Sequence, residues 1–378
     1  MLECKMGKMN DSQSKSVLLQ GYLAGSNFGD ILIAHLFYSH CTALPFREVD
    51  FLQFRNYGIG EFCRKELGYA ERKSFWNCLR YDAFILVSGG YLWDNHTFLK
   101  PWQRFLRFFF FPFIYQLMGK PVYVLGAGGG EVLTPWLRKA MVHVLNKAKV
   151  VYVRDAATKD VFTRYGVGEH MKVTADTALA VTSDMLPVFE KKADLEAHAG
   201  GRKKLFFHVF EANGQNRLIN KNVVPALLEF LKSHKEYMLI MSGDNTKAYE
   251  PKIQDSIYTM RQQFIDEGID VYDYTYHDCW QLCALLNEVD CIVTPKLHVG
   301  VVGSVLGKCV IAFPVHPEKT DHFYQMIGQS DRCCNMVKLT VPRAKEMIEQ
   351  FHNVPVVIPD ELIKKAKCNL KVIDSLVN

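Results

Sequence analysis

The chain has 378 residues, which is long for a single hydrophobic core and comfortable for two domains of ordinary size. Hydrophobic residues make up 49% of it and aromatic residues 12%, so a disordered chain is excluded. The formal net charge of +5 is modest, and we expect no nucleic-acid partner.

The eleven cysteines are scattered along the chain and do not form a disulfide framework. Cys279, Cys283, Cys291 and Cys309 fall within predicted helices and strands, and no Cys-x-x-Cys pair occurs. We therefore expect reduced, mostly buried thiols and no metal site. The first apolar run, residues 17–19, is too short for a cleavable export signal, which predicts a cytoplasmic protein.

The first part of the chain alternates strand-like and helix-like segments. The apolar run at 16–23 predicts a strand, and a helix is expected at 30–40 because Asp30 favours a helix start. Further strands are predicted at 48–51, 84–88, 122–126 and 150–154. This alternation is typical of a parallel sheet with helices on both faces.

Glycine-rich segments follow three of these strands. They contain Asn27 and Asp30 in the first segment, Gly89 and Gly90 in the second, and Gly128 and Gly129 in the third. A tight turn explains any one of them, but three at one sheet edge predict that a ligand approaches the backbone closely. The third segment is not a dinucleotide fingerprint, because Glu131 stands where the last glycine would be.

A basic and aromatic block follows the second glycine segment. Between Lys100 and Lys149 there are eight Lys or Arg residues against Glu131 alone. The block contains the aromatic run 105–118, which is too short and too interrupted to span a bilayer. Two interpretations remain open: a core helix of an α/β domain, or a segment at a membrane interface with basic residues over anionic lipid.

Arg154 ends the predicted strand 150–154 and could bind a carboxylate or a phosphate with its planar guanidinium. The alternative is a salt bridge to Asp155 or Asp176. The composition then becomes charged over 183–204, which predicts a linker. We therefore expect an N-terminal domain over 1–182, a second domain over 205–340, and C-terminal helices over 341–378.

A second alternation of strands and helices begins after the predicted linker. Strands are expected at 205–210, 237–241 and 270–274, and helices at 223–233, 249–267 and 279–287. The predicted fold class is α/β, with two doubly wound, Rossmann-like domains facing one another across a cleft.

The segment 291–319 predicts a strand, a helix, a strand and a polar loop. The strand 291–293 precedes a helix at 297–306, Gly307 stands at the position of a C-terminal cap, and a second strand covers 310–313. Lys296 and His298 lie at the helix N-terminus, where free N–H groups attract anions. His316, Lys319 and His322 follow the second strand. Together they predict a site for a small, multiply charged anion.

The order of these motifs, over about residues 20–330, resembles the polysaccharide pyruvyl transferases. The resemblance rests on 27–30, 88–91, 126–128, 153–155, 175–176, and on Lys296, Leu297 and His298 with Lys319. It implies a GT-B-like fold and transfer of an enolpyruvyl unit from phosphoenolpyruvate to a sugar as a ketal, without a further cofactor. Lys296 stands where many members carry arginine, so this chain lacks the planar fork at that position.

The implied acceptor is a sugar of a cell-surface or capsular polysaccharide repeat unit. The basic block 100–149 and its aromatic run, both in the N-terminal domain, predict that this acceptor is carried on a lipid and met by a peripheral protein at the inner face of the cytoplasmic membrane. His298 is the expected proton donor and acceptor, with Lys296 beside it. The expected substrate-binding residues are Asn27, Asp30, Gly89, Gly90, Gly128, Gly129, Arg154, Asp176, His316 and Lys319.

Two other functions stay open at this point. The first is a GT-B nucleotide-sugar glycosyltransferase, whose phosphates would use the same helix N-terminus. The second is a non-enzymatic sugar-binding or assembly protein.

Overall fold

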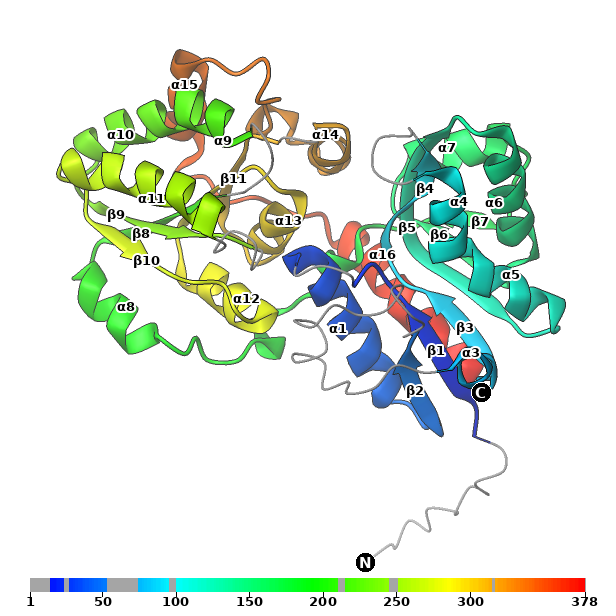
Figure 1. Cartoon of the computed structure of the whole chain (residues 1–378). Coiled ribbons are helices and arrows are strands. Elements are labelled where there is room, and N and C mark those ends of the chain that lie inside the picture. The colour runs from blue at the N-terminus through cyan, green and yellow to red at the C-terminus, as the bar shows by residue number, and fades with distance from the viewer. Residues whose placement is uncertain are drawn as a thin grey trace, which may run out of the picture. The chain divides into compact units, whose positions relative to one another are not determined.

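A computed structural model of the chain describes residues 14–23, 27–52, 74–94, 100–209, 215–244, 251–314 and 317–377. Within it the chain forms two compact units (Figure 1). Unit 1 comprises residues 1–25, 33–177 and 364–378, and unit 2 comprises 26–32 and 178–363.

Unit 1 is built on a seven-stranded parallel sheet of order β2-β1-β3-β5-β6-β7, with β4 paired to β5. The strands are β1 (Ser16–Gln20), β2 (Glu48–Phe51), β3 (Ala83–Leu86), β4 (Gly89–Asp94), β5 (Val122–Val132), β6 (Val150–Val153) and β7 (Met171–Val173). The helices are α3 (Phe75–Leu79), α4 (Pro101–Arg104), α5 (Phe110–Leu117), α6 (Pro135–Lys147) and α7 (Ala156–Arg164). Two more helices, α1 (Phe28–Thr42) and α16 (Asp360–Lys371), have their first turns in unit 2 and the rest in unit 1, and a 3-10 turn at Val372–Leu376 follows α16. The predicted doubly wound α/β class is confirmed.

Two segments predicted as glycine-rich loops are strands. Gly89 and Gly90 begin β4, and Gly128 and Gly129 lie inside β5, which runs on beside β4. A Cβ at Gly128 would lie 2.4 Å from Nε of Arg154, and one at Gly129 would lie 2.0 Å from the carbonyl oxygen of Leu92. Gly128 and Gly129 are therefore needed because other protein atoms approach the strand closely. The second and third of the expected glycine-rich loops are parts of β4 and β5 instead.

The aromatic run forms a continuous helical stretch of α4, a π-helical segment Phe105–Phe109, and α5. Phe108, Phe109 and Phe111 are buried in the core of unit 1, which confirms the core interpretation for these side chains. Pro112 lacks an N–H and its ring crowds the carbonyl four residues earlier, so a widened turn just before it relieves the clash. Of the residues described, none belongs to a helix with the length and apolar character needed to cross a bilayer.

Unit 2 is built on a five-stranded parallel sheet of order β10-β9-β8-β11-β12. Its strands are β8 (Lys203–His208), β9 (Tyr237–Ser242), β10 (Val271–Asp273), β11 (Cys291–Thr294) and β12 (Cys309–Ala312). Its helices are α8 (Lys192–Ala199), α9 (Gln215–Leu218), α10 (Val224–Ser233), α11 (Pro251–Asp266), α12 (Cys279–Glu288), α13 (Leu297–Val305), α14 (Pro317–Met326) and α15 (Val341–Phe351). A π-helical segment at Ile219–Val223 and 3-10 turns at Thr177–Ala180, Ser183–Met185 and Ser330–Arg332 complete the described elements.

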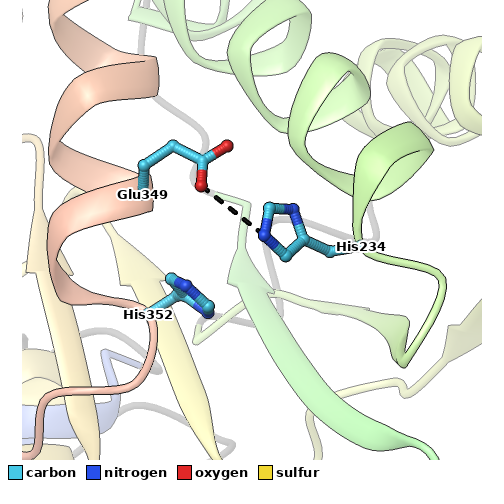
Figure 2. Close-up of side chains that lie close together, drawn as sticks. All are labelled: His234, Glu349 and His352. Carbon is cyan, nitrogen blue, oxygen red and sulfur yellow. Dashed lines mark ion pairs between the residues drawn. The ribbon is translucent and has the colours of Figure 1, made fainter.

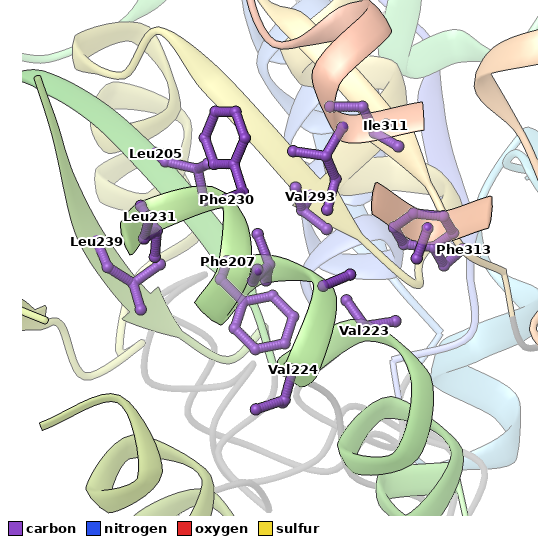
Figure 3. Packing of buried hydrophobic residues seen from close by; sticks show 14 of the residues in the cluster. Leu205, Phe207, Val223, Val224, Phe230, Leu231, Leu239, Val293, Ile311 and Phe313 are labelled. Carbon is purple, nitrogen blue, oxygen red and sulfur yellow. The ribbon is translucent and has the colours of Figure 1, made fainter. Parts of the chain in front are cut away.

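The strands of unit 2 are buried on both faces, which explains why they read as continuous apolar runs. Leu205 and Phe207 of β8 point to one face, where they join the core formed with α10, α11 and α15 (Figure 3). On the opposite face a Cβ at Gly303 would lie 2.4 Å from Cδ1 of Ile292. The glycine therefore lets α13 lie close to the sheet.

The division of the chain differs from the predicted one in two places. The predicted linker 183–204 contains α8, whose Leu195 and Ala199 are buried, and it belongs to unit 2. Its high charge reflects the exposed side of that helix. The predicted C-terminal segment 341–378 is also not a separate part, because α15 packs in unit 2 whereas residues from 364 onward belong to unit 1.

The last helix is held in unit 1 by one buried amide. Asn369 is fully buried, and its Nδ2 donates to the carbonyl of Ala175 at 3.0 Å and to Oγ1 of Thr177 at 2.9 Å. Its Oδ1 accepts from Oγ1 of Thr174 at 2.8 Å. Thr177 also contacts Oγ of Ser88 at 2.5 Å, so α16 closes a polar network at the carboxyl ends of the unit 1 strands.

We expect Asn369→Ala to lower the free energy of unfolding by about 2–4 kcal/mol, because it leaves several buried polar groups without their partner. Ser375→Ala is the matched control, since its hydroxyl bonds only the exposed carbonyl of Val372. Urea unfolding followed by circular dichroism measures both. Equal midpoints for the two variants would contradict this role of Asn369.

Candidate active site

The order of strands in unit 2 defines where a ligand is expected. The chain leaves β8 for β9 and β10 on one side and then returns to add β11 and β12 on the other side. The boundary between β8 and β11 is therefore a topological switch point, and ligands of such sheets bind outside the carboxyl ends of the strands there. Polar side chains follow all three central strands at this edge.

A buried ion pair lies at the switch point. Lys296, which precedes α13, places its Nζ 2.8 Å from Oδ1 of Asp244, which follows β9. His208, the last residue of β8, places its Nε2 3.3 Å from the same oxygen. Asp244 is 3% exposed and His208 is fully buried, so water does not screen these charges.

The protonation states follow from these contacts. Burial alone would raise the pKa of Asp244, but attraction by Lys296 and His208 outweighs it and lowers that pKa. Burial lowers the pKa of His208, with Asp244 opposing the shift. Burial thus favours the neutral form of His208, whose Nδ1 lies 2.8 Å from the hydroxyl of Thr294.

The first turn of α1 belongs to unit 2 and adjoins this ion pair. The N–H of Phe28 donates to the carbonyl of Asp244 at 2.9 Å. Oδ1 of Asn27 accepts from the N–H of Gly29 at 3.1 Å, so Asn27 caps the helix. Asn27, predicted to bind substrate, therefore has a local structural use.

His298 lies in the first turn of α13 and packs directly on Gly29. A Cβ at Gly29 would lie 1.9 Å from Nδ1 of His298, so no other residue fits beneath this imidazole. Lys296 immediately precedes α13 and has an extended backbone. The N-terminal turns of α1 and α13 are consequently both part of this site, and both favour anions.

Asp30 is the second carboxylate of the site. Burial raises its pKa to about 6, although His298, Lys319 and Lys296 attract the charged form; Asp244 raises it further. A carboxyl group with this pKa gives and takes a proton close to neutral pH. The site therefore combines two lysines, two helix N-termini and a carboxyl group suited to proton transfer.

The structure brings some of the predicted site residues together and leaves others apart. Unit 2 contains Lys296, His298 and Lys319 of the predicted anion site. It also contains Asn27 and Asp30, which were predicted to lie in the N-terminal domain. His316 lies outside the described residues. The remaining predicted residues belong to unit 1: Gly89, Gly90, Gly128, Gly129, Arg154 and Asp176.

Arg154 is engaged by two carboxylates of unit 1. Its Nη1 lies 3.3 Å from Oδ2 of Asp176 and its Nε lies 3.7 Å from Oδ2 of Asp155. The Arg154 and Asp176 side chains are 10% and 6% exposed. The salt-bridge alternative is confirmed, and Arg154 does not present a free positive charge to a ligand.

Sequence reasoning missed His208 and Asp244. Both lie at the carboxyl ends of apolar strands, which is the signal that could have found them. Their importance depends on β8, β9 and β11 being neighbours, and no local pattern shows this order.

Several solved structures share the architecture of this chain. The UDP-GlcNAc 2-epimerase of Methanocaldococcus jannaschii matches with a TM-score of 0.62 and 13% identity, covering 96% of this chain and 98% of that chain. The UDP-GlcNAc 2-epimerase of Neisseria meningitidis, bound to UDP-GlcNAc, matches with a TM-score of 0.61 and 12% identity, covering 95% and 99%. At this identity the likeness shows the fold, which is GT-B-like.

A sequence profile of the polysaccharide pyruvyl transferases matches residues 27–317. The chain therefore belongs to the polysaccharide pyruvyl transferase family, and it is a transferase. No curated protein matches its sequence.

The raised pKa of Asp30 leads to a pH-dependent prediction. A folded-state pKa of about 6, above the ordinary 3.8, means that the folded state binds this proton more tightly. The free energy of unfolding of the wild type therefore falls as pH rises from about 4 to about 6. The variant does not show this loss, because Asn cannot ionise. We expect Asp30→Asn to gain about 1–3 kcal/mol of stability relative to wild type between about pH 4.5 and about pH 7.5.

Thermal unfolding of both proteins at the two pH values measures this change. Asp273→Asn, which removes an exposed carboxylate of unit 2, controls for the loss of one negative charge. A difference between Asp30→Asn and wild type that stays constant with pH would show that Asp30 keeps an ordinary pKa.

Proposed function

We propose that this transferase moves an enolpyruvyl unit from phosphoenolpyruvate to a sugar and leaves it there as a pyruvate ketal. The observation that carries the proposal is the cluster of Lys296, His298, Asp30 and Lys319 at the switch point of unit 2. The family to which the chain belongs supports the reaction class.

Phosphoenolpyruvate suits this site because it carries about three negative charges on few atoms. Lys296 and Lys319 supply positive charge, and the N-terminal turns of α1 and α13 supply N–H groups. Lys296 is pre-positioned by Asp244, so it loses little freedom when the donor binds. Arg154 lies in unit 1, where it is paired with Asp155 and Asp176, and we do not assign it to this donor site.

The reaction needs one proton delivered and others removed. The vinyl carbon of the donor takes up a proton, and a sugar hydroxyl attacks the neighbouring carbon, which becomes cationic. That hydroxyl loses its proton, the carbon–oxygen bond to phosphate breaks, and a second hydroxyl closes the ketal with loss of its proton. The products are the ketal and inorganic phosphate. We assign the proton donor to Asp30 and the base for the first hydroxyl to His298.

The test is whether phosphoenolpyruvate and not a UDP-sugar raises the melting temperature, and how variants change this effect. Lys319→Gln removes one charge near Asp30 and should weaken phosphoenolpyruvate binding by about 1.5–3 kcal/mol, the value of a charge-assisted hydrogen bond. Lys338→Gln, an exposed lysine of unit 2, is the matched control. His298→Ala should still bind the donor but lose turnover by about 10²–10⁴.

Three results would count against the proposal. Stabilisation by UDP-sugars alone would favour a nucleotide-sugar glycosyltransferase. Equal phosphoenolpyruvate affinity in Lys319→Gln and Lys338→Gln would remove Lys319 from the site. Activity of His298→Ala within about ten-fold of wild type would make His298 a packing residue.

We further propose that the acceptor is carried on a lipid, as a repeat unit of a cell-surface or capsular polysaccharide, and that unit 1 docks reversibly on the inner face of the cytoplasmic membrane. Trp102, Leu133 and Trp136 are exposed, and Phe105, one turn after Trp102, packs against Trp136 at 6.1 Å. We call Trp102, Leu133 and Trp136 the tryptophan surface. Aromatic side chains of this kind favour the headgroup region of a bilayer.

Only half of the basic block is available for such docking. Arg104 is buried against Trp93, Arg107 and Arg138 lie over tyrosine rings, and Lys120 donates to two backbone carbonyls. The exposed members are Lys100, Lys139, Lys147 and Lys149. At about 1 kcal/mol each, they would support weak and salt-sensitive binding.

Co-sedimentation with phosphatidylglycerol vesicles tests this docking. We expect binding at low salt that falls as salt rises, and that weakens by about 1 kcal/mol per charge neutralised in Lys139→Gln with Lys147→Gln. Trp136→Ala should also weaken it, whereas Lys338→Gln in unit 2 should not. Absence of binding to anionic vesicles at low salt would remove the membrane from the proposal.

A further inference from the structure

Two histidines and one glutamate form a cluster at the amino-terminal edge of the unit 2 sheet, away from the carboxyl edge that carries the candidate active site. His234 lies between α10 and β9, and Glu349 and His352 lie at the end of α15. Their ligand atoms lie within 4.8 Å of one another, and the three side chains point into a common space (Figure 2). We propose that His234, Glu349 and His352 bind one divalent transition-metal ion, with Zn²⁺ preferred.

Both histidines are fixed by the helices that carry them. The backbone N–H of His234 donates to the carbonyl of Phe230, and that of His352 donates to the carbonyl of Ile348, both at 2.9 Å. Phe230 and Ile348 belong to one hydrophobic core, so the helices are held together independently of any ion. The ligands also lie at the C-terminal ends of α10 and α15, where the helix dipole favours a cation.

The contacts of His234 leave its Nε2 facing the glutamate. Its Nδ1 lies 3.1 Å from the carbonyl oxygen of Phe230. A carbonyl only accepts, so Nδ1 carries a proton and Nε2 is the ring nitrogen left to bind an ion. Nε2 lies 3.5 Å from Oε2 of Glu349. A cation bound to both atoms would replace this direct contact with coordination.

His352 is oriented in the same way by outer partners. Its Nδ1 lies 3.1 Å from the hydroxyl of Tyr237, and that hydroxyl donates to Oδ1 of Asn353 at 2.9 Å. A hydroxyl has one proton, so Nδ1 donates to Tyr237 and Nε2 keeps its lone pair. Nδ2 of Asn353 lies 3.4 Å from Nε2, a long contact that an ion would replace. Such outer-shell bonds are typical of histidines that bind metal.

The donor set selects the kind of ion. Two imidazoles and a carboxylate suit Zn²⁺, with bonds of about 2.0–2.2 Å and neighbouring ligand atoms about 3.4 Å apart in a tetrahedron. The ligand atoms therefore have to close by roughly 1 Å. The side chain of Glu349 is 38% exposed, so its carboxylate can move toward the two imidazole rings, and water can complete the shell. The ion would tie α15 to α10.

Metal binding is measured directly on full-length protein without a histidine tag, after removal of bound ions with a chelator. We expect wild type to retain one Zn²⁺ per chain on dialysis and to gain thermal stability from Zn²⁺. His234→Ala, His352→Ala and Glu349→Gln should each weaken binding by about ten-fold or more. His277→Ala, which removes an imidazole 3.2 Å from Glu190 but outside the cluster, should leave binding unchanged.

Cobalt substitution separates this site from adventitious binding by cysteines. A site of two histidines and a glutamate gives Co²⁺ ligand-field bands without a thiolate charge-transfer band. Circular dichroism shows whether each variant is folded. If the alanine variants do not fold, Glu349→Gln still tests the site, because glutamine keeps the shape of the glutamate side chain. Equal Zn²⁺ retention by wild type and Glu349→Gln, or a thiolate band with Co²⁺, would overturn the proposal. Neither result depends on the reaction that the protein catalyses.

Discussion

The buried carboxylate of Asp244 is the constraint on which the site in unit 2 depends. A carboxylate removed from water costs several kcal/mol unless cations and hydrogen bonds compensate it. Lys296 and His208 provide that compensation, and they are thereby held at fixed positions. The carbonyl of the same residue accepts from the first turn of α1. One residue thus sets the place of a lysine, an imidazole and a helix N-terminus.

The same arrangement couples ligand binding to protonation. Asp30 shares its surroundings with Lys296, Lys319 and His298, which attract its charged form. An anion bound by those cations would compete for the same attraction and would favour the protonated carboxyl group. A donor with several negative charges would therefore raise the pKa of Asp30 as it binds, and the carboxylate would take up a proton. Substrate binding and supply of the proton would be one process.

Local sequence signals predicted the central unit of the site well. Thr294 and Pro295 stop β11, Gly307 ends α13 with a positive φ of 72°, and both boundaries agree with the structure within one or two residues. Signals of this kind act over a few residues, so the chain carries them in its sequence. The doubly wound class followed from the same alternation of strands and helices.

Several failures of prediction involve partners that are far apart in the chain. Glycine at 128 permits a ligand or an arginine side chain to approach, and the sequence does not show that Arg154 is the neighbour. Asp244 and Lys296 are separated by 52 residues, and their pairing depends on strand order. Arg154 had two stated alternatives, and only the fold decides between them.

The return of α16 to unit 1 has a consequence for the synthesis of the chain. Residues 178–363, which make up nearly all of unit 2, leave the ribosome before Asn369 does. Unit 1 is then still without the amide that joins Thr174, Ala175 and Thr177. Domains fold as units once their residues are available, so unit 2 can be completed first although it comes second in the sequence. If synthesis stops before residue 369, unit 2 is complete, whereas unit 1 lacks the helix that carries Asn369.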